Sequence, residues 1–461
     1  MRTPDVLNRE TGRRGGFWSF PSPRLPVSLL ILPVLIAGCR KPSAAWLDDA
    51  GSDAEAVDAE VIDAGPVVLP ARCVPSLGGA TVGAVGDFEI GEAVATPHGF
   101  AIGVLHKVNG EMLGAIALVP SDAKTVTFVD LGPPIGDAPP PRAIAVGADV
   151  YAAFFVRPPP PVPGGKPKPT RDLALYRIAD GKATLTTTIA EQRDESLAYD
   201  LALTDKGGVV AWDEDAIGNE RGNIKIALVS ADTKTVVSTR IASPDASDTE
   251  LPRVVARKGG FWLAWVASRL EAPDAGLEPG QEIERPGEKR RYKWLELVAL
   301  DAAGAQVGAV KRLTPNNGHV SMFDLAARAG GDALDVIARD DEQAVDGAGG
   351  RIVRISIAGD KVDPPIAIVS ESVGRGAPDL LDVAGAAWLA FSDTHDRVRL
   401  VPLDATRTPA APMSGEDALD KARVLLVAGV KPAADGGSVT DVLAAFPEEP
   451  QGQLRFVGCA R

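Results

Sequence analysis

The feature that most constrains the fold of this 461-residue chain is a short segment that recurs along it. Each copy is a turn of glycine or small residues, followed by an apolar and often aromatic stretch. Seven copies are found, at residues 98–104, 147–155, 207–212, 259–265, 330–337, 385–391 and 436–446. Short apolar runs separated by Gly, Asp and Pro are typical of strands and turns, not of helices. From residue 71 onward the sequence therefore predicts an all-β domain.

Two longer segments repeat more closely. Residues 116–126 and 226–236 agree at eight of eleven positions and lie 110 positions apart. Each reads as a strand, a tight turn and a second strand. Together with the seven recurring segments, this similarity indicates a repeat of roughly 50 residues with one central apolar strand and one hairpin.

A repeat of this kind resembles the blades of β-propeller proteins, in which each four-stranded sheet buries both faces against its neighbours. The resemblance covers about residues 75–461 and concerns architecture alone, because the Gly-His and Trp-Asp signature of WD40 blades and a full kelch pattern are absent. It implies a seven-bladed propeller in residues 71–461. The alternatives are six or eight blades, or two β-sandwich domains.

The amino-terminal segment has the pattern of an export signal. Residues 1–38 carry five arginines before or at the start of the apolar run 25–37, which is too short for a comfortable bilayer span of about 20 residues. The run ends in Leu35-Ile36-Ala37-Gly38-Cys39, which resembles the lipobox of bacterial lipoproteins. The resemblance implies cleavage before Cys39, lipid on that cysteine and a membrane anchor in the cell envelope. Arg40, in place of Asp, favours the outer membrane. A signal anchor with an incidental cysteine is the alternative.

Residues 39–70 are rich in Ala and Asp and contain little that could form a core, so they are predicted to be a flexible acidic tether. Removal of residues 1–38, which hold five arginines and two acidic residues, changes the formal charge from −14 to −17. Such an acidic chain is a poor partner for nucleic acid.

Two cysteines remain after Cys39. Cys73 lies at the start of the predicted domain and Cys459 lies three residues from its end. In an oxidising envelope the two are natural disulfide partners, and such a bond would join the ends of the chain. Two free or separately buried thiols are the alternative.

Loop length is concentrated between the second and third predicted strands of the repeats. These long loops are residues 157–170, 213–223, 268–291, 340–350 and 392–397, and in a propeller they open on one rim. Loops held by a rigid scaffold often carry binding sites. The candidate binding residues on this rim are Asp213, Asp215, Asp340, Asp341, Asp393 and His395. Solvated turn residues are the alternative for each of them.

Rim carboxylates could bind Ca²⁺ or supply a glycosidase pair, but the sequence establishes neither chemistry. Residues 213–218 lack the EF-hand spacing, and the four histidines are too scattered to predict a zinc site. No nucleophile elbow, phosphate-binding loop or Cys-x-x-Cys pair is present, so no catalytic residue, metal site or cofactor is assigned. Residues 230–236 resemble the first half of the Ser-x-Asp-x-Gly-x-Thr-Trp turn of sialidase-type propellers, a structural feature in that family.

The leading interpretation is a membrane-tethered propeller without enzymatic activity, which binds a protein, peptide or glycan on its long-loop rim or acts as an envelope scaffold. The alternative is a propeller hydrolase or lyase acting on polysaccharide or peptide, which would need at least two acidic groups plus Arg or Tyr converging at the ring centre. A purely structural surface protein is a third interpretation. Trp212, Trp262, Trp265 and Trp388 fall in the central strands and are predicted to be core residues.

Overall fold

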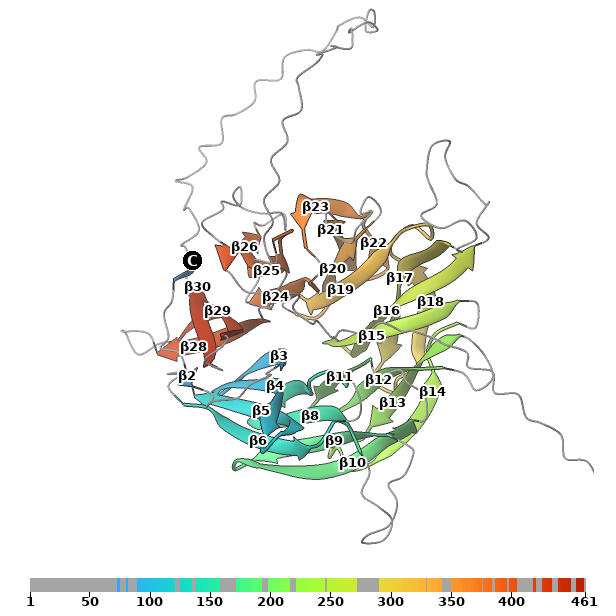
Figure 1. Cartoon of the computed structure of the whole chain (residues 1–461). Helices are drawn as coiled ribbons and strands as arrows, with labels where there is room; N and C mark the ends of the chain where they lie inside the picture. The colour runs from blue at the N-terminus through green and yellow to red at the C-terminus, as the bar shows by residue number, and fades with distance from the viewer. Residues whose placement is uncertain are drawn as a thin grey trace, which may run out of the picture. The chain divides into compact units, whose positions relative to one another are not determined.

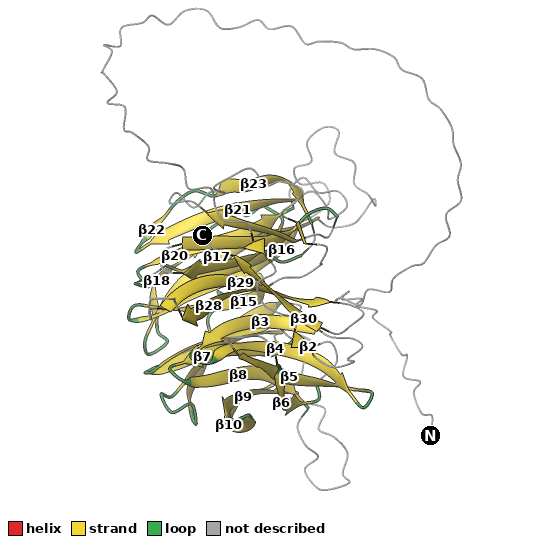
Figure 2. Ribbon diagram, turned by 90° about the vertical axis from the view of Figure 1, so that its left-hand side faces the viewer, coloured by secondary structure: helices red, strands yellow, loops and turns green. Residues whose placement is uncertain are grey.

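In the computed structural model, the described residues are 73–74, 80–81, 89–120, 125–134, 138–157, 171–192, 198–215, 221–244, 247–271, 290–328, 330–341, 350–374, 376–383, 386–395, 398–403, 418–419, 425–432, 438–448 and 453–459. The predicted signal peptide and the whole of the predicted tether, including Cys39, lie outside this set. The described part consists of strands and loops (Figure 2). No helix within it is long and apolar enough to cross a bilayer.

The described strands form seven sheets (Figure 1). The first three contain β3 (Glu89–Thr96), β4 (Gly99–Val108), β5 (Glu111–Pro120) and β6 (Thr127–Gly132); β7 (Arg142–Val146), β8 (Asp149–Val156), β9 (Arg171–Ala179) and β10 (Lys182–Gln192); and β11 (Tyr199–Thr204), β12 (Gly207–Asp215), β13 (Gly222–Val229) and β14 (Val236–Ile241). The next three contain β15 (Asp248–Arg257), β16 (Gly260–Glu271), β17 (Arg290–Asp301) and β18 (Gln306–Arg312); β19 (Val320–Ala327), β20 (Ala333–Asp340), β21 (Gly350–Ala358), β22 (Lys361–Val362) and β23 (Ile366–Val373); and β24 (Asp379–Val383), β25 (Ala386–Ser392), β26 (Val398–Leu403) and β27 (Ala418–Leu419).

The remaining sheet combines the two ends of the domain. It contains β28 (Leu425–Pro432), β29 (Ser438–Glu448) and β30 (Gln453–Cys459), and β30 pairs with both β1 (Cys73–Val74) and β2 (Ala80–Thr81). All pairings within the seven sheets are antiparallel between neighbouring strands, as in β3 with β4 and β4 with β5. We call this remaining sheet the composite sheet.

The sheets are arranged around a common axis, as Figure 1 shows. The first strand of each sheet contacts the first strand of the next, in the order β3, β7, β11, β15, β19, β24, β28 and back to β3. The chain is thus an all-β propeller with four-stranded blades, and this prediction from the sequence is confirmed. Two separate β-sandwich domains are not what is observed.

The predicted number of seven blades, each formed by one repeat, needs correction. Six blades are each built from consecutive strands, and six was one of the alternative blade numbers. The seventh recurring segment, residues 436–446, contributes β29 to the composite sheet. The reason is that β30 pairs with β1 and β2, so strands from the other end of the domain take the outer position of this sheet.

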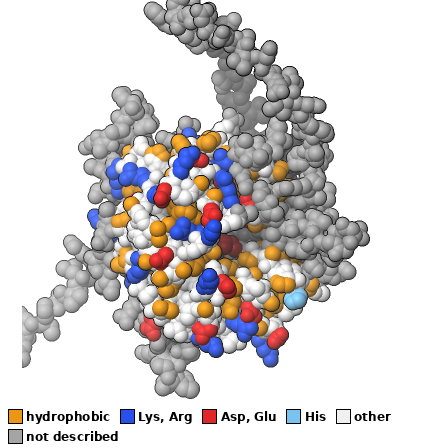
Figure 3. All heavy atoms as spheres, turned by 180° about the vertical axis from the view of Figure 1, so that it is seen from behind, with side chains coloured by type: hydrophobic (Ala, Val, Ile, Leu, Met, Phe, Trp, Pro, Cys, Tyr) orange, Lys and Arg blue, Asp and Glu red, His pale blue; other side chains and the backbone are white. Residues whose placement is uncertain are grey.

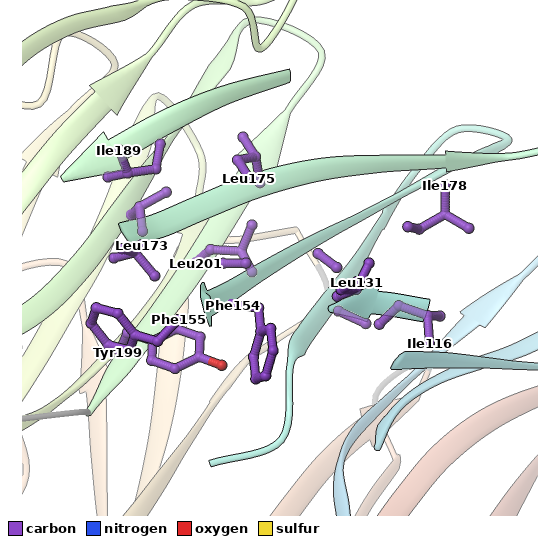
Figure 4. Packing of buried hydrophobic residues seen from close by; sticks show 14 of the residues in the cluster. Ile116, Leu131, Phe154, Phe155, Leu173, Leu175, Ile178, Ile189, Tyr199 and Leu201 are labelled. Carbon is purple, nitrogen blue, oxygen red and sulfur yellow. The ribbon is translucent and has the colours of Figure 1, made fainter. Parts of the chain in front are cut away.

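The core lies between neighbouring blades and is formed mainly by their second strands. On β12 and β16, Trp212, Trp262 and Trp265 are at most 2% exposed, and Trp388 on β25 is equally buried. These four tryptophans are core residues, as predicted. Figure 4 shows Phe154, Phe155 and Tyr199 packed with aliphatic residues of successive blades. Gly103 allows one very close contact, because a Cβ there would lie 1.7 Å from the carbonyl oxygen of Pro141 on the next blade.

Candidate functional site

A charged side chain stands at an equivalent position on six inner strands, defined by the residue that it faces on the second strand. Arg142, Asp200, Arg253 and Asp379 each lie directly opposite an alanine of the second strand, and Asp324 lies opposite Ile337. Glu92 occupies the bulge between two paired positions of β3. We call these residues the charged belt; its members are Glu92, Arg142, Asp200, Arg253, Asp324 and Asp379.

The pairing register places the belt at one level of the propeller. The residues opposite five of its members are each the fifth residue of their second strand, as Ala153 is in β8 and Ala211 in β12. The belt therefore lies near the middle of the blades, where the inner strands of neighbouring blades contact one another.

The local sequence explains why the charged side chains of the belt lie on the same face of their strands. The residue before each belt position is buried, and it is proline at Pro141, Pro252 and Pro378. Proline has no N–H to donate to a ladder, so it is tolerated where an edge strand begins, as at Pro141 and Pro378, or at a bulge, as at Pro252. Since side chains alternate between faces along a strand, burial of this residue fixes the orientation of the charged residue that follows.

Three members of the belt form a continuous ionic contact. The guanidinium of Arg142 contacts the carboxylate of Glu92, and its Nε lies 3.9 Å from Oδ1 of Asp200. The exposed fraction of the side chain falls from 39% for Glu92 to 13% for Arg142 and 9% for Asp200. Burial, followed by the nearby Arg253, lowers the pKa of Arg142 to about 10. Arg142 therefore remains a cation at neutral pH.

Two aspartates of the belt also join neighbouring blades. Oδ2 of Asp200 accepts a hydrogen bond from the backbone N of Val254 at 2.8 Å, and Oδ2 of Asp324 accepts one from the backbone N of Leu380 at 2.8 Å. Burial raises the pKa of Asp324, while hydrogen bonds from Leu380 and with the Asp379 side chain, and the charge of Arg253, oppose this rise. Asp379 directly precedes Leu380, so its carboxyl group belongs to the surroundings of Asp324, as does the charge of Arg253.

Tyr199 precedes Asp200 but is not available for chemistry in this arrangement. Its hydroxyl donates to the carbonyl oxygen of Pro140 at 3.1 Å, and its ring meets Phe155 edge to face at 5.1 Å between centroids. Burial raises its pKa. Figure 4 shows it within the apolar cluster, so its role is to pack two blades together.

Figure 3 shows the face of the molecule that is turned away in Figure 1. Charged side chains of both signs lie around the middle of this face, and acidic side chains are seen in the shaded hollow there.

The rim residues predicted from the sequence belong to three different blades. Asp213 on β12 is 4% exposed, and its carboxylate accepts hydrogen bonds from the backbone N of Ala198 and of Leu251. It therefore joins its own blade to the next one. Asp215 ends β12, and its side chain lies outside the described residues.

The other rim carboxylates are matched with arginines of their own blades. Asp340 pairs with Arg351 directly opposite it, and Asp341 pairs with Arg339. Asp393 is 2% exposed and pairs with Arg399. The exposed His395 donates its backbone N–H to the carboxylate of Asp393 at 2.9 Å. Most of the long loops themselves lie outside the described residues.

The rim carboxylates were predicted as candidate ligands for Ca²⁺. Among the residues that the structure describes, no three or more His, Cys, Asp or Glu side chains are grouped so that they could hold a metal ion.

The turn at residues 230–235 has the closed hydrogen bonding that its sequence suggested. The Ser230 hydroxyl donates to Asp232 at 2.6 Å, and the same carboxylate accepts the backbone N–H of Lys234 at 3.1 Å. Thr235 donates its backbone N–H to the Ser230 hydroxyl. The turn joins β13 to β14 and is structural.

Sequence reasoning missed the charged belt, although a signal for it exists. Glu92, Arg142, Asp200, Arg253 and Asp379 each lie 11 positions before an alanine or glycine of the following second strand, and Asp324 lies 13 positions before Ile337. The recurring segments identify the second strands. The first strands mix polar with apolar residues, so they form no recurring segment of their own.

Comparison with protein families and with curated proteins finds no match. Among solved structures, the chain is similar to the β-propeller domain of the Trilobed protease from Pyrococcus furiosus, with 9% identity, a TM-score of 0.42 and coverage of 81% of this chain and 94% of that one. It is also similar to the GH43 endo-arabinanase from Bacillus licheniformis, with 12% identity, a TM-score of 0.29 and coverage of 57% and 92%. These values carry no information on the activity of this chain.

Proposed function

We propose that this protein is a lipid-anchored envelope protein whose propeller binds a polar ligand, either a peptide of a partner protein or a glycan, at the charged belt. The observation that carries the proposal is the placement of six charged side chains at one level around the propeller axis. Sites of this kind use a few well-placed polar groups to orient a ligand.

The composition of the belt indicates what kind of ligand fits. Four carboxylates accept hydrogen bonds and two guanidinium groups donate them. Peptide backbones and sugar hydroxyls offer both donors and acceptors, so they match such a mixed set. A polyanion does not, because the carboxylates outnumber the guanidinium groups and the chain is acidic overall. Nucleic acid is therefore not proposed as a partner.

The anchor is proposed from the sequence at residues 35–39. Lipid on Cys39 and the acidic segment up to about residue 70 would hold the propeller near a membrane of the cell envelope, with the outer membrane favoured by Arg40. Firm attachment takes two or more acyl chains, which the resemblance to lipoproteins implies. The ligand would then be a component of the envelope or of its surroundings.

The composite sheet is proposed to close the ring as its seventh blade. Its inner strand β28 contacts both β24 and β3, while β1 and β2 supply its outer edge. A sheet shared by both chain ends removes two exposed strand edges, which would otherwise be free to pair with other chains.

The binding proposal can be tested with glycan and peptide arrays probed by the full-length protein. Glu92→Gln and Arg142→Gln are expected to reduce binding of the ligands found by about 10- to 100-fold, the effect of losing a hydrogen bond to a charged group. Asp205→Asn is the matched control, because Asp205 is exposed and follows the opposite end of the strand that carries Asp200. Equal binding by all variants would refute a site at the belt.

A hydrolase is the second candidate function, favoured by Asp324 and Asp379 on neighbouring inner strands, where Asp324 accepts the backbone N–H of Leu380. Two neighbouring carboxyls can divide the roles of acid and base, and a guanidinium such as that of Arg253 can stabilise developing negative charge. The test is turnover of polysaccharide and peptide substrates by the full-length protein. Loss of turnover in Asp324→Asn and Asp379→Asn, with retained turnover in Asp205→Asn, would support an enzyme. Binding without turnover would exclude it.

A further inference from the structure

Two buried aspartates of one blade hold the inner strand of the next blade at two points. Asp200 on β11 is 6% exposed and Asp213 on β12 is 4% exposed. Oδ2 of Asp200 accepts the backbone N–H of Val254 at 2.8 Å. Oδ2 of Asp213 accepts the backbone N–H of Leu251 at 3.3 Å. The two bonds therefore hold β15 on either side of Arg253, the member of the charged belt on that strand.

The segment held in this way is a β-bulge. The register of β15 with β16 shifts between Glu250 and Arg253. Leu251 and Pro252 therefore face a single residue of β16. Such a bulge bends its strand and changes the direction of the side chains around it. The side chain that directly follows the bulge is that of Arg253.

Leu251 has an unfavourable backbone conformation within the bulge. Its φ is 56°, in the left-handed region, which is costly for a residue with a Cβ. The other described residues with positive φ that are not glycine lie in turns between strands; they are Asn109, Asp180 and Thr233. A strained residue persists where its surroundings restrain it, and the bond from the Leu251 N–H to Asp213 is such a restraint.

The shape of the bulge also determines where the guanidinium group of Arg253 lies. Nη1 of Arg253 donates a hydrogen bond to the backbone carbonyl oxygen of Pro252 at 3.1 Å. That carbonyl group is part of the bulge, so its position depends on the backbone conformation of Leu251. Bonded groups thus lead from the carboxylate of Asp213, through the bulge, to the guanidinium group.

We infer that Asp213 is a positioning residue for the charged belt, because it holds the bulge of β15 in the conformation that places the guanidinium group of Arg253. The inference rests on the proposed function, since it gives Asp213 a part in ligand binding that is exerted through Arg253. The charge of Arg253 acts on Arg142 and Asp324, so a displaced guanidinium group would also change the interactions of these two belt members.

Phenylglyoxal, a reagent that modifies arginine side chains, reports on Arg253 in the full-length protein without any ligand. Asp213→Asn leaves one acceptor oxygen for two backbone donors, the N–H groups of Ala198 and Leu251. The rate at which Arg253 is modified, followed by mass spectrometry, should then rise by about tenfold, the effect of releasing a hydrogen bond to a charged group. Arg257, on the same strand beyond the bulge, should keep its rate. An equal rise at both arginines, or at neither, would overturn the inference.

A second substitution separates positioning from a general loss of stability. Glycine adopts the left-handed region without the cost of a Cβ, so Leu251→Gly in the Asp213→Asn background should return the modification rate of Arg253 toward that of the wild type. Leu251→Ala also removes the leucine side chain but keeps a Cβ, so it should give no such return. Equal rates in the two double variants would contradict a role for the Leu251 backbone and overturn the inference.

The consequence for binding is measured on the glycan and peptide arrays that test the proposed function. Arg253→Gln should weaken the binding of array ligands, and adding Asp213→Asn should weaken it little further, because both changes act through one guanidinium group. Additive losses would overturn the inference. If the wild type binds no array ligand, the proposed function fails, while the phenylglyoxal experiment still decides whether Asp213 positions Arg253.

Hydrogen exchange of the wild-type protein covers the case in which the variants do not fold. The amides of Leu251 and Val254 should show the same protection, because a bulge held at both ends opens as one unit. Much weaker protection of Leu251 than of Val254 would mean that Asp213 does not restrain the bulge, and the inference would be wrong.

Discussion

Cys73 lies directly opposite Cys459 in the antiparallel pairing of β1 with β30. Residues opposite each other in such a pair have Cα atoms about 4.5 to 5.5 Å apart, which is within the range that disulfides span. The pairing therefore supports the bond predicted from the sequence, which remains a prediction. It would fasten the outer edge of the composite sheet.

The disulfide prediction can be checked by intact mass and thermal unfolding. The oxidised chain should be two hydrogen atoms lighter than the reduced one, and reductant should lower its stability by up to about 6 kcal/mol if the bond is unstrained. Cys73→Ser should show the lower stability without reductant and no further response to it. Two alkylatable thiols in the native envelope protein would contradict the prediction.

The second prediction concerns Cys39. The mature protein isolated from the cell envelope should begin at Cys39 and carry acyl chains on it, because residues 35–39 resemble a lipobox. Mass spectrometry of the amino-terminal peptide measures both features. The Cys39→Ser variant should carry no acyl chains. It should therefore partition into the aqueous phase after detergent extraction. A wild-type chain that retains residues 1–38 without lipid would refute the assignment.

The third prediction compares two tryptophans on β16. The indole of Trp265 donates to Oε2 of the buried Glu296 at 3.0 Å, whereas the buried indole nitrogen of Trp262 has no hydrogen-bond partner among the described residues. Trp265→Phe leaves one carboxylate oxygen of Glu296 without this donor, while Trp262→Phe removes an unsatisfied donor. Trp265→Phe should thus destabilise the protein by about 1 to 3 kcal/mol more than Trp262→Phe.

Denaturant unfolding of both variants measures this difference. A useful addition is Glu296→Gln, since Trp294 also donates to Glu296 at 2.9 Å and an amide has only one oxygen to accept two indoles. Its loss of stability should resemble that of Trp265→Phe. Similar stability of the two Phe variants would mean that the hydrogen bond to Glu296 makes no net contribution.

The second strands could be predicted from the sequence because burial on both faces gives them long apolar runs, as in residues 259–265. The first strands were harder to recognise. Arg142–Val146 and Asp379–Val383 contain five residues each and begin with a charge, so they lack a long apolar run, and what defines these strands is contact with the neighbouring blade. Such contacts join residues far apart in the chain, as Asp324 joins Leu380.

The composite sheet shows a similar limit. Its outer strands β1 and β2 contain two residues each, and nothing within them indicates a strand. They are strands because β30 offers them a partner nearly the whole length of the domain away. The two cysteines were the sole sequence signal that the ends meet. The rim aspartates were recognised as a group, but their arginine partners lie on strands whose pairing the sequence does not reveal.

Those arginine partners lead to the last prediction. The pair of Asp393 and Arg399 is buried, with side chains 3% and 12% exposed, whereas Arg351, the partner of Asp340, is 38% exposed. Removing one partner of a buried ion pair leaves an uncompensated charge and costs about 3 to 5 kcal/mol, and the cost falls toward about 0 to 1 kcal/mol, the value for a surface pair, when one partner is exposed, as Arg351 is beside the buried Asp340. Arg399→Met should therefore destabilise the protein far more than Arg351→Met, as measured by denaturant unfolding. If both variants are equally stable, Asp393 does not need Arg399 for folding, and the binding role first predicted for this rim residue becomes the better explanation of the pair.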